Sequence, residues 1–372
     1  MLRAGIRSFL GTCREGTVVP LDDDVLALAA HYLFSERRRA AEIKDLLQNH
    51  KITINNSDTY NVIIPAIIEK GWLHFKAPWN TNLSLQLRKT FHLQQVQVTR
   101  TNYLDDVASR AAFMVLDLLR SKAKRQIVRV GFSGGHTTRK VFQRLALLLA
   151  EPSQTLPERI VFHALVAGFD FEAPGADPTS FFTYLAERQT RFGFLLLHAP
   201  PVVQPGKLQA LLSLPGVDKA YQGAKNLDLI VTSAAVFSDD HSQLGKYYRD
   251  NDRTTYERLK QEGCIGDMLW LPVNDTRPMD LSGYDYRPVT LLELDDLPAR
   301  VQNHTKVLLV IGPCADPSHS NCQGRKTAIL RAIINLNLKD KNRKYITHLV
   351  VDNATAEELV QPHFAAAAGT TA

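Results

Sequence analysis

The chain has 372 residues, of which 45% are hydrophobic and 22% charged, and its formal net charge is +6 at pH 7. This length and apolar content predict two globular domains with separate cores and exclude a disordered chain. The most apolar stretch, residues 61–73, is interrupted by Pro65, Glu69 and Lys70, so it falls short of the roughly 18 to 20 apolar residues of a membrane span. The cysteines Cys13, Cys264, Cys314 and Cys322 are scattered, as is typical of reduced thiols in a cytoplasmic protein.

Helical patterns come first. Acidic residues at 22–24 can begin a helix with apolar positions over 25–33, and further helices are predicted at 38–48 and from 57 to Gly71. The alternating segment 72–76 resembles a wing strand. We therefore expect a winged helix-turn-helix at 21–82, preceded by a flexible N-terminus at 1–20.

A joint at 83–102 leads to a long region, 103–362, in which helices and strands alternate, and the tail 363–372 is expected to be flexible. Helices are predicted at 104–121, 139–150, 179–190, 205–212 and 325–336, and strands at 127–132, 160–167, 193–198, 227–232, 306–311 and 348–351. Such alternation predicts an α/β, Rossmann-like domain with a mostly parallel sheet, whose ligand lies beyond the carboxyl ends of the strands.

One turn at such a strand end has the composition of an anion site. The strand 127–132 is followed by Ser133, Gly134, Gly135, His136, Thr137 and Thr138, and then by an amphipathic helix. The two glycines permit a tight turn and a close backbone approach, while the N–H groups of the first helical turn attract negative charge. An ordinary strand-to-helix connection with Ser133 or Thr137 as N-cap is the alternative.

Several short motifs, in this order, resemble the SorC family of sugar-binding transcriptional regulators. They are the predicted helix-turn-helix, LSLQLRKTFHLQQVQVT at 83–99, GGHTT at 134–138, GCIGD at 263–267, RKTAI at 325–329 and HLVVDNATAEELV at 348–360. The resemblance covers most of the chain. It implies an effector domain similar to pentose-phosphate isomerases and amino-sugar-phosphate deaminases, which binds phosphorylated sugars without converting them.

The resemblance also implies the effector-binding residues. The residues at the phosphate-holding turn are Gly134, Gly135, His136, Thr137 and Thr138. Asp267 matches a family carboxylate that can accept hydrogen bonds from sugar hydroxyls, although a capping Asp in a turn is the alternative. Arg325 occupies the place of a family lysine with Lys326 beside it, and either supplies a cation. Asp352 matches an Asp at the end of the last strand.

Two departures from the family pattern concern the effector site. Residues 232–235 (TSAA) replace a Gly-Ile-Gly turn and add side chains where backbone approaches the ligand. The loop 312–324 is long and contains Cys314, His319 and Cys322. These three lack a fourth ligand and a standard spacing, so we expect a plain loop and no metal, and the sequence indicates no cofactor.

A third departure concerns DNA. Asp58 stands in the third predicted helix where a phosphate contact is expected, and Pro65 should kink or shorten that helix. The cations expected to contact DNA phosphates are Arg37, Arg38, Arg39, Lys44 and Lys51. Basic and acidic residues are interspersed over the whole chain, so the net charge permits DNA binding without requiring it.

These observations favour a cytoplasmic transcription regulator that binds a phosphorylated sugar and operator DNA, acts as a homodimer or homotetramer, and is not an enzyme. One alternative is a sugar-phosphate sensor that has lost DNA binding, as Asp58 and Pro65 suggest. The other is an isomerase or deaminase with Asp267 or Asp170 as the proton-transfer carboxylate. The N-terminal domain discriminates, because an enzyme has no need of it.

Overall fold

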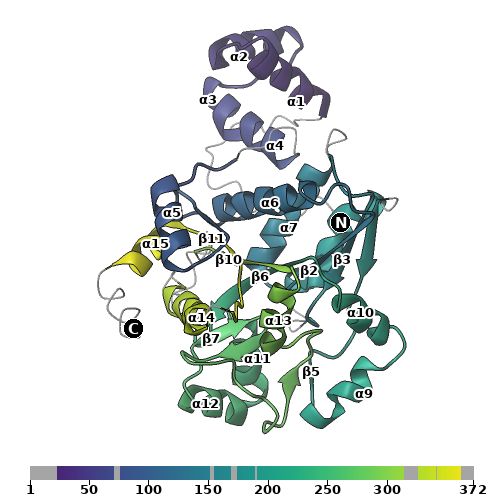
Figure 1. Cartoon of the computed structure of the whole chain (residues 1–372). Helices are drawn as coiled ribbons and strands as arrows, with labels where there is room; N and C mark the ends of the chain where they lie inside the picture. Colours follow the sequence, from purple (N-terminus) through teal and green to yellow (C-terminus); the bar gives the residue numbers. More distant parts are fainter. Residues whose placement is uncertain are drawn as a thin grey trace. The chain divides into compact units, whose positions relative to one another are not determined.

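A computed structural model describes residues 23–70, 76–150, 155–168, 174–188, 191–313, 326–340 and 342–361 (Figure 1). The chain divides into two compact units, residues 1–75 and 76–372, which are described separately. Among the described helices, none is long and apolar enough to cross a membrane.

The described part of the first unit consists of three helices around a small core. They are α1 (Asp23–Ala30) with a π-helical turn at His31–Ser35, α2 (Ala40–Asn49), and a third helix made of α3 (Asn56–Asp58), a π-helical turn at Thr59–Ile63 and α4 (Ile64–Glu69). Their buried side chains are Leu26, Ala29, Ile43, Leu47, Ile54, Ile63 and Ile67. The three predicted helices are thus present. The proposed wing, 72–76, lies outside the described residues except for Lys76.

The third helix continues past Pro65, so the proline does not shorten it as the sequence suggested. Helical backbone continues from Asn56 to Glu69, and the turn preceding the proline is widened, with the N–H of Ile64 donating to the carbonyl of Thr59. Proline lacks the N–H for an ordinary helical bond, and a wide turn relieves the contact between its ring and the preceding carbonyls. The helix therefore keeps its full length.

A mostly parallel sheet organises the second unit and confirms the predicted Rossmann-like α/β class. Its parallel strands lie in the order β1 (Gln95–Val98), β11 (His348–Val351), β10 (Lys306–Ile311), β6 (Leu229–Val236), β2 (Ile127–Phe132), β3 (Arg159–Ala164) and β4 (Phe192–Leu195). The hairpin of β7 (Gly266–Met268) and β8 (Leu271–Val273) adds antiparallel to the end of β6. A small ribbon pairs β5 (Val202–Val203) with β9 (Arg287–Pro288).

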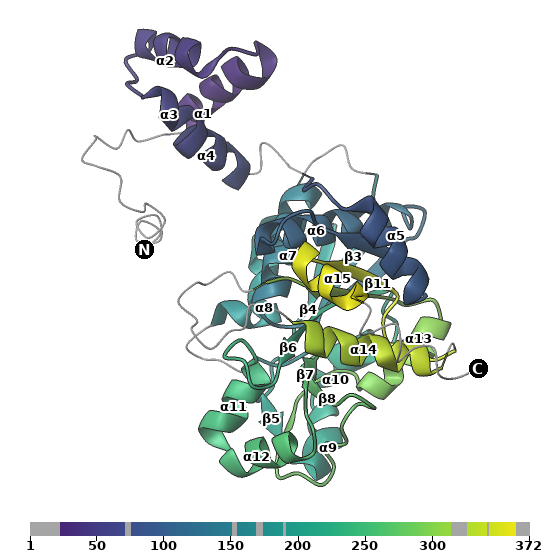
Figure 2. The same ribbon diagram turned by 90° about the vertical axis from the view of Figure 1, so that its left-hand side faces the viewer.

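Helices cover both faces of this sheet (Figure 2). On one face lie α6 (Leu104–Arg120), α7 (His136–Leu149) and α8 (Pro178–Phe181), and on the other α10 (Val217–Ala224), α13 (Leu297–Gln302) and α14 (Thr327–Lys339). The remaining helices are α5 (Thr81–Thr90), α9 (Leu208–Leu212), α11 (Gln243–Asn251), α12 (Arg253–Gln261) and α15 (Asn353–Val360). This arrangement follows from right-handed crossovers between parallel strands.

The boundary between the two units lies earlier than the 82/83 boundary that the sequence suggests. The segment 83–102, expected to be a joint, contains most of α5 and all of β1, and β1 pairs with β11 from Gln95–His348 to Val98–Val351. A strand hydrogen-bonded into the sheet belongs to the domain that the sheet organises. The division accordingly falls between Phe75 and Lys76.

The connections after the neighbouring strands β2 and β6 leave on opposite sides of the sheet. β2 leads into α7 on one face, whereas β6 leads by way of α11, α12 and the β7–β8 hairpin to α13 on the other. Such divergence opens a crevice at the carboxyl ends of the two strands, where ligands bind in open α/β sheets. The Gly134–Gly135 turn follows β2 directly and therefore lies at this crevice.

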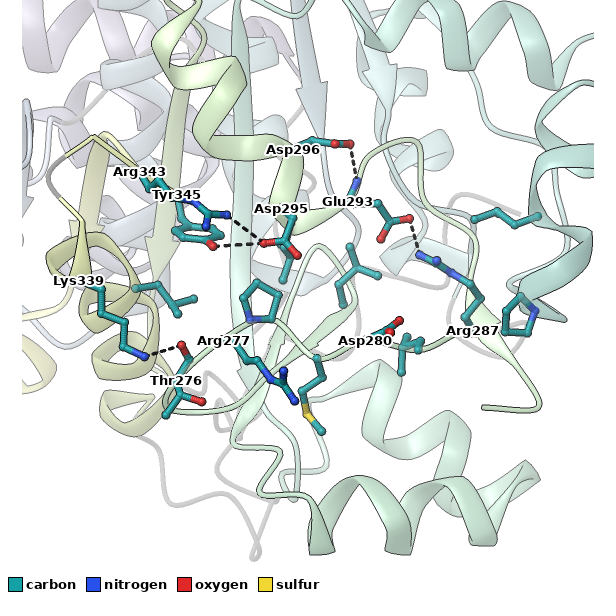
Figure 3. A pocket seen from close by; sticks show the side chains of 18 of the residues that line it. Thr276, Arg277, Asp280, Arg287, Glu293, Asp295, Asp296, Lys339, Arg343 and Tyr345 are labelled. Atoms are coloured by element: carbon teal, nitrogen blue, oxygen red, sulfur yellow. Dashed lines mark hydrogen bonds and ion pairs between the residues drawn. The ribbon is translucent and has the colours of Figure 1, made fainter. Parts of the chain in front are cut away.

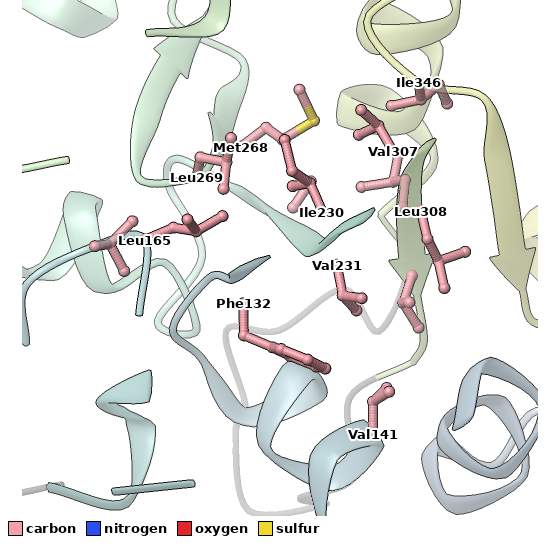
Figure 4. Close-up of a cluster of buried hydrophobic side chains, with 14 of the residues drawn as sticks. Phe132, Val141, Leu165, Ile230, Val231, Met268, Leu269, Val307, Leu308 and Ile346 are labelled. Atoms are coloured by element: carbon pink, nitrogen blue, oxygen red, sulfur yellow. The ribbon is translucent and has the colours of Figure 1, made fainter. Parts of the chain in front are cut away.

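Buried side chains hold α7 in position beneath the crevice. Phe142 on α7 meets Phe132 of β2 and Phe162 of β3 edge to face, with ring centroids 5.0 and 5.1 Å apart. Figure 4 shows the surrounding apolar core, in which Phe132 and Val141 lie near Val231 of β6. Because the start of α7 forms the predicted anion turn, this packing fixes that turn against the sheet.

We predict that Phe142→Ala lowers the free energy of unfolding by about 3 to 5 kcal/mol, because it removes a fully buried ring and leaves a cavity. Urea denaturation of the purified variant measures the effect. Tyr103→Ala, which truncates an exposed ring, is the control and should change stability by about 0.5 kcal/mol or less. A small decrease in the free energy of unfolding of Phe142→Ala would contradict the anchoring role of the aromatic cluster.

Candidate functional site

A cavity of about 370 Å³ lies at the carboxyl ends of β2 and β6. Its lining combines the turn after β2, the end of β6, the start of α11, the β7–β8 hairpin and the residues on either side of the loop 314–325. The predicted effector residues that it brings together are Gly134, Gly135, His136, Thr137, Asp267 and Lys326. Residues more than 190 positions apart in sequence thus meet at one site.

Both glycines of the turn are required by its geometry. Gly135 has a φ of +112°, which side chains of L-residues rarely adopt, and it is the N-cap of α7. A Cβ added at Gly134 would lie 2.5 Å from Cζ2 of Trp270 and 2.9 Å from the carbonyl oxygen of Ala176. The turn therefore brings bare backbone to the cavity wall.

The first turn of α7 offers hydrogen-bond donors to an anion. The N–H of Gly135 donates to the carbonyl of Ala176 at 2.8 Å, and that of Arg139 returns to the carbonyl of Gly135 at 3.0 Å. The N–H groups of His136, Thr137 and Thr138 have no acceptor among the described residues. Together with the helix dipole, these N–H groups have the chemistry to attract an anion.

Thr138 differs from its predicted role. Its hydroxyl donates to the carbonyl of Gly135 at 3.0 Å, and the residue is fully buried and does not line the cavity. The side chain therefore stabilises the turn, and only the backbone N–H remains for a ligand. Thr137, also buried, does line the cavity.

Asp267 is a buried carboxyl group that also lines the cavity. It lies on β7 with 4% of its surface exposed, and its Oδ2 accepts a 2.8 Å hydrogen bond from the hydroxyl of Ser242. Burial raises its pKa to about 7, against the opposing effects of the Ser242 hydrogen bond and the charge of Lys326. Since Asp267 lies within a strand, the alternative of a capping Asp is wrong.

Basic side chains outnumber acidic ones in the lining of the crevice. Arg139, Lys246 and Lys326 are cationic, the imidazoles of His136 and His241 lie beside them, and the acidic residues of the lining are Asp240 and Asp267. The pKa of His136 is lowered, first by desolvation and then by its cationic neighbours, among them Arg139, His241 and Lys326. A positive field of this kind favours an anionic ligand. Arg325, the predicted family-lysine equivalent, lies outside the described residues, so Lys326 is the cation that the structure brings to the site.

Sequence reasoning missed the contribution of α11. Gln243, in the first turn of that helix, lines the cavity, and its Oε1 is buried with no donor among the described residues. An amide oxygen in this position can accept a hydrogen bond from a ligand hydroxyl. Of the segment 232–235, Ser233, Ala234 and Ala235 line the cavity, whereas Thr232 is fully buried and does not.

The other candidate positions have structural roles or lie outside the described residues. Asp352 is the N-cap of α15, with its Oδ1 accepting the N–H of Thr355 at 2.9 Å. The loop residues Cys314, His319 and Cys322, and also Asp170, lie outside the part of the chain that the structure describes. Within the described part, no group of His, Cys, Asp or Glu side chains has the arrangement of a metal site.

A second cavity, of about 860 Å³, lies beside residues that precede β10 and β11 (Figure 3). Its charged groups are mostly occupied with one another. Asp295 accepts hydrogen bonds from Arg343 and Tyr345 at 3.5 and 3.3 Å, and Arg287 pairs with Glu293. This mutual pairing leaves less unbalanced charge for a ligand than the crevice at β2 and β6.

In the first unit, the predicted DNA-contact cations lie at the surface. Arg37 and Arg39 are exposed before α2, Lys51 is exposed in the turn after it, and Lys44 is partly exposed on α2. Arg38 is also exposed, but its Nε donates to Glu36 at 3.0 Å. These cations therefore lie exposed or partly exposed before, on and after α2.

Asp58 has a local role that the sequence-based interpretation did not assign. Its carboxylate accepts the N–H of Asn55 at 2.7 Å, which is one half of a capping box at the start of the third helix. The charge is thus used to satisfy a backbone donor and to complement the helix dipole. Its presence is explained without reference to DNA.

Comparisons with known proteins agree with this architecture. No protein-family model matches the chain, and no curated protein matches it in sequence. The full-length sorbitol operon regulator SorC from Klebsiella pneumoniae aligns with a TM-score of 0.59 at 15% identity, over 92% of this chain and 100% of that one. A probable sor operon regulator from Shigella flexneri aligns with a TM-score of 0.57 at 16% identity, over 76% and 99%.

A DeoR family transcriptional regulator from Listeria monocytogenes aligns with a TM-score of 0.54 at 17% identity, over 75% of this chain and 98% of that one. The chain therefore has the fold of the SorC and DeoR regulators, as the resemblance in sequence predicted. The likeness extends to the full length of one such regulator.

We predict that Asp267 makes stability depend on pH. The folded state holds the proton of this group up to about pH 7, whereas the unfolded state loses it near pH 3.9. Its contribution is therefore complete below pH 4 and is lost as the pH rises through 7, by on the order of 2 to 3 kcal/mol between pH 5 and 8. The free energy of unfolding of Asp267→Asn, measured with urea at pH 5 and at pH 8, should not show this loss.

The exposed Asp285 supplies the control, since Asp285→Asn should retain the pH dependence of the wild type. An identical difference between pH 5 and pH 8 in wild type and Asp267→Asn would show that the carboxyl group is ionised throughout this range.

Proposed function

We propose that the protein is a cytoplasmic, effector-responsive transcription regulator that binds a phosphorylated sugar in the second unit and operator DNA through the first. The observation that carries the proposal is the crevice at β2 and β6. There the available N–H groups of His136 and Thr137 at a helix start, a set of basic side chains and a buried carboxyl group line one cavity. The shared fold with sugar-operon regulators supports the same reading.

In this proposal two groups of lining residues recognise different parts of the ligand. The phosphate lies on the N–H groups of His136 and Thr137, near Lys326. Asp267 and Gln243, which line the same cavity, bind sugar hydroxyls, because a carboxyl and an amide offer both acceptors and donors. A ligand must then carry an anionic group and hydroxyls to engage both groups of residues.

The enzyme alternative has less support. The similar structures described above are regulators, and an isomerase or deaminase has no need of the N-terminal helices. The carboxyl group of Asp267 accepts a hydrogen bond from the hydroxyl of Ser242. Ser242 is itself the N-cap of α11 and accepts a hydrogen bond from the N–H of Gly245 at 2.9 Å. We assign this carboxyl group to ligand binding.

The third helix of the first unit has a surface suited to DNA. Its outward residues include Asn56, Ser57, Tyr60 and Asn61, and Tyr60 is 63% exposed. Asparagine can pair with adenine through two hydrogen bonds, so these side chains suit base edges. The basic residues at 37–39 and 51 suit phosphates, which position a protein on DNA. The alternative of a sensor without DNA binding loses its main support, because Asp58 is a cap and Pro65 leaves the helix intact.

Ligand and DNA would be coupled in an oligomer, which we propose to be a homodimer or homotetramer. If the effector binds better to one arrangement of subunits, it changes operator affinity, and the operator changes effector affinity by the same factor. A two-fold-symmetric operator with half-sites a whole number of helical turns apart is then expected.

We predict that Gly135→Val abolishes binding of phosphorylated sugars. A β-branched residue is strained at a φ of +112° and displaces the backbone that should approach the phosphate. Gly216→Val is a matched control, since Gly216 is also a helix N-cap with positive φ and open space around it, but lies away from the cavity. Calorimetric titration with phosphorylated and unphosphorylated forms of the same sugars measures the effect.

Wild type should bind only the phosphorylated forms, and Gly216→Val should bind as wild type does. Equal binding of neutral sugars, or an unchanged affinity in Gly135→Val, would contradict the placement of the phosphate.

We predict that operator affinity falls steeply with salt, with a slope of about −0.9 for each phosphate contact in a plot of log affinity against log salt concentration. Replacing Arg37, Arg38 and Arg39 together by Ala should flatten the slope. Replacing the exposed Arg88, Lys89 and Arg253 of the second unit removes the same charge and should leave the slope unchanged. Fluorescence anisotropy with fragments of the protein's own promoter region provides the measurement.

The absence of wild-type binding at about 50 mM salt, where electrostatic attraction is strong, would refute the DNA-binding part of the proposal and favour a sensor that acts through protein contacts.

A further inference from the structure

The turn between β7 and β8 has an unfavourable backbone. Leu269 and Trp270, its two central residues, have φ values of +57° and +59°. A two-residue hairpin turn with two positive φ angles strongly favours Asn-Gly, because bulky side chains crowd the backbone in this conformation. Two large apolar residues are instead held here, at the edge of the candidate site.

This backbone places Trp270 in the cavity wall. Trp270 and Leu269 both line the cavity, and Trp270 is only 5% exposed. Its Cζ2 would lie 2.5 Å from a Cβ at Gly134, so the indole edge lies against the anion turn itself. The apolar wall formed by these residues adjoins the phosphate position inferred above.

Filling the core does not by itself explain the strain. A buried indole stabilises the fold in any backbone conformation, whereas backbone in a sparsely populated region persists mainly where the position of the side chain matters. Here the conformation places the indole ring of Trp270 against the Gly134–Gly135 turn of the candidate cavity. The lining also includes the apolar side chains of Leu104, Leu269 and Pro313, but among the described lining residues Trp270 carries the only Phe, Tyr or Trp ring, so it is the one aromatic surface against which a sugar can rest.

We propose that Trp270 is a specificity-determining residue that selects sugar phosphates over simple anions, by offering its ring to the C–H groups of the sugar. The electron-rich face of an indole attracts the weakly positive hydrogens of such groups. Inorganic phosphate satisfies the helix start but makes no use of the ring. This inference depends on the proposed function and concerns how the same site chooses its ligand.

The test compares affinities for inorganic phosphate and for glucose 6-phosphate, fructose 6-phosphate and ribose 5-phosphate by calorimetry. In Trp270→Ala the tightest of these sugar phosphates should lose about tenfold in affinity. Inorganic phosphate should change little, so the preference of the site for the sugar phosphate collapses. Trp270→Phe keeps an aromatic ring and should retain most of the preference.

Trp79→Phe is the matched control, because Trp79 packs against Arg110 with 5.2 Å between the guanidinium carbon and the ring centroid, and does not line the cavity. Its affinities should equal those of wild type. If Trp270→Ala weakens inorganic phosphate and sugar phosphate by the same factor, the ring only supports the turn, and the proposal is overturned.

A second measurement does not depend on the folding of any Trp270 variant. The chain has three tryptophans, so Trp72→Phe combined with Trp79→Phe leaves Trp270 as the only indole. Its emission should shift on saturation with the sugar phosphate, and an unchanged emission would refute contact with the ring. If wild type binds none of the phosphate compounds, the proposed function itself fails. If wild type binds them and the emission of Trp270 does not change, only the role of the ring is refuted.

Discussion

The pairing of β2 with β6 is the constraint on which the site depends. The two strands are parallel, with Val130, Gly131 and Phe132 paired to Leu229, Ile230 and Val231. After each strand the chain continues on a different face of the sheet. Because no connection crosses their carboxyl ends, the turn after β2 and the extension of β6 face the same crevice. The β7–β8 hairpin closes one side, since it pairs with that extension and carries Asp267 and Trp270 to it.

The crevice contains several features that reduce stability and are maintained by the surrounding fold. Gly135, Leu269 and Trp270 all have positive φ angles, Asp267 is buried with a raised pKa, and the Oε1 of Gln243 is buried without a donor. The positive φ angles of Leu269 and Trp270, the buried carboxyl group and the unpaired amide oxygen are each unfavourable for folding, whereas glycine adopts a positive φ readily. Their concentration at one cavity is typical of a site whose geometry is set by ligand binding. Rigid packing around Phe142 supports the strained turns from below.

The sequence predicted the parallel strands and the position of the Gly134–Gly135 turn because their signals are local. Residues 127–132, 306–311 and 348–351 are strands at the predicted positions, and the glycine pair directly follows the first of them. The β7–β8 hairpin and the role of Gln243 could not be predicted. Leu269–Trp270 lacks any turn-forming residue, and Gln243 reaches the site only through the tertiary position of α11. The early boundary at Phe75 was missed because β1 pairs with a strand 250 residues away.

An aspartate can serve either as a local helix cap or as a group of a binding site. Its burial and its hydrogen-bond partners distinguish the two roles. Asp58 and Asp352 each accept an N–H at a helix start, so their charges are satisfied within a few residues of sequence. Asp267 has no such local donor. Its hydrogen-bond partner, Ser242, lies on another element, and the carboxyl group faces a cavity lined with basic side chains. A buried carboxyl held by a distant hydroxyl contributes little to local structure, which is the arrangement expected of a group that serves a site.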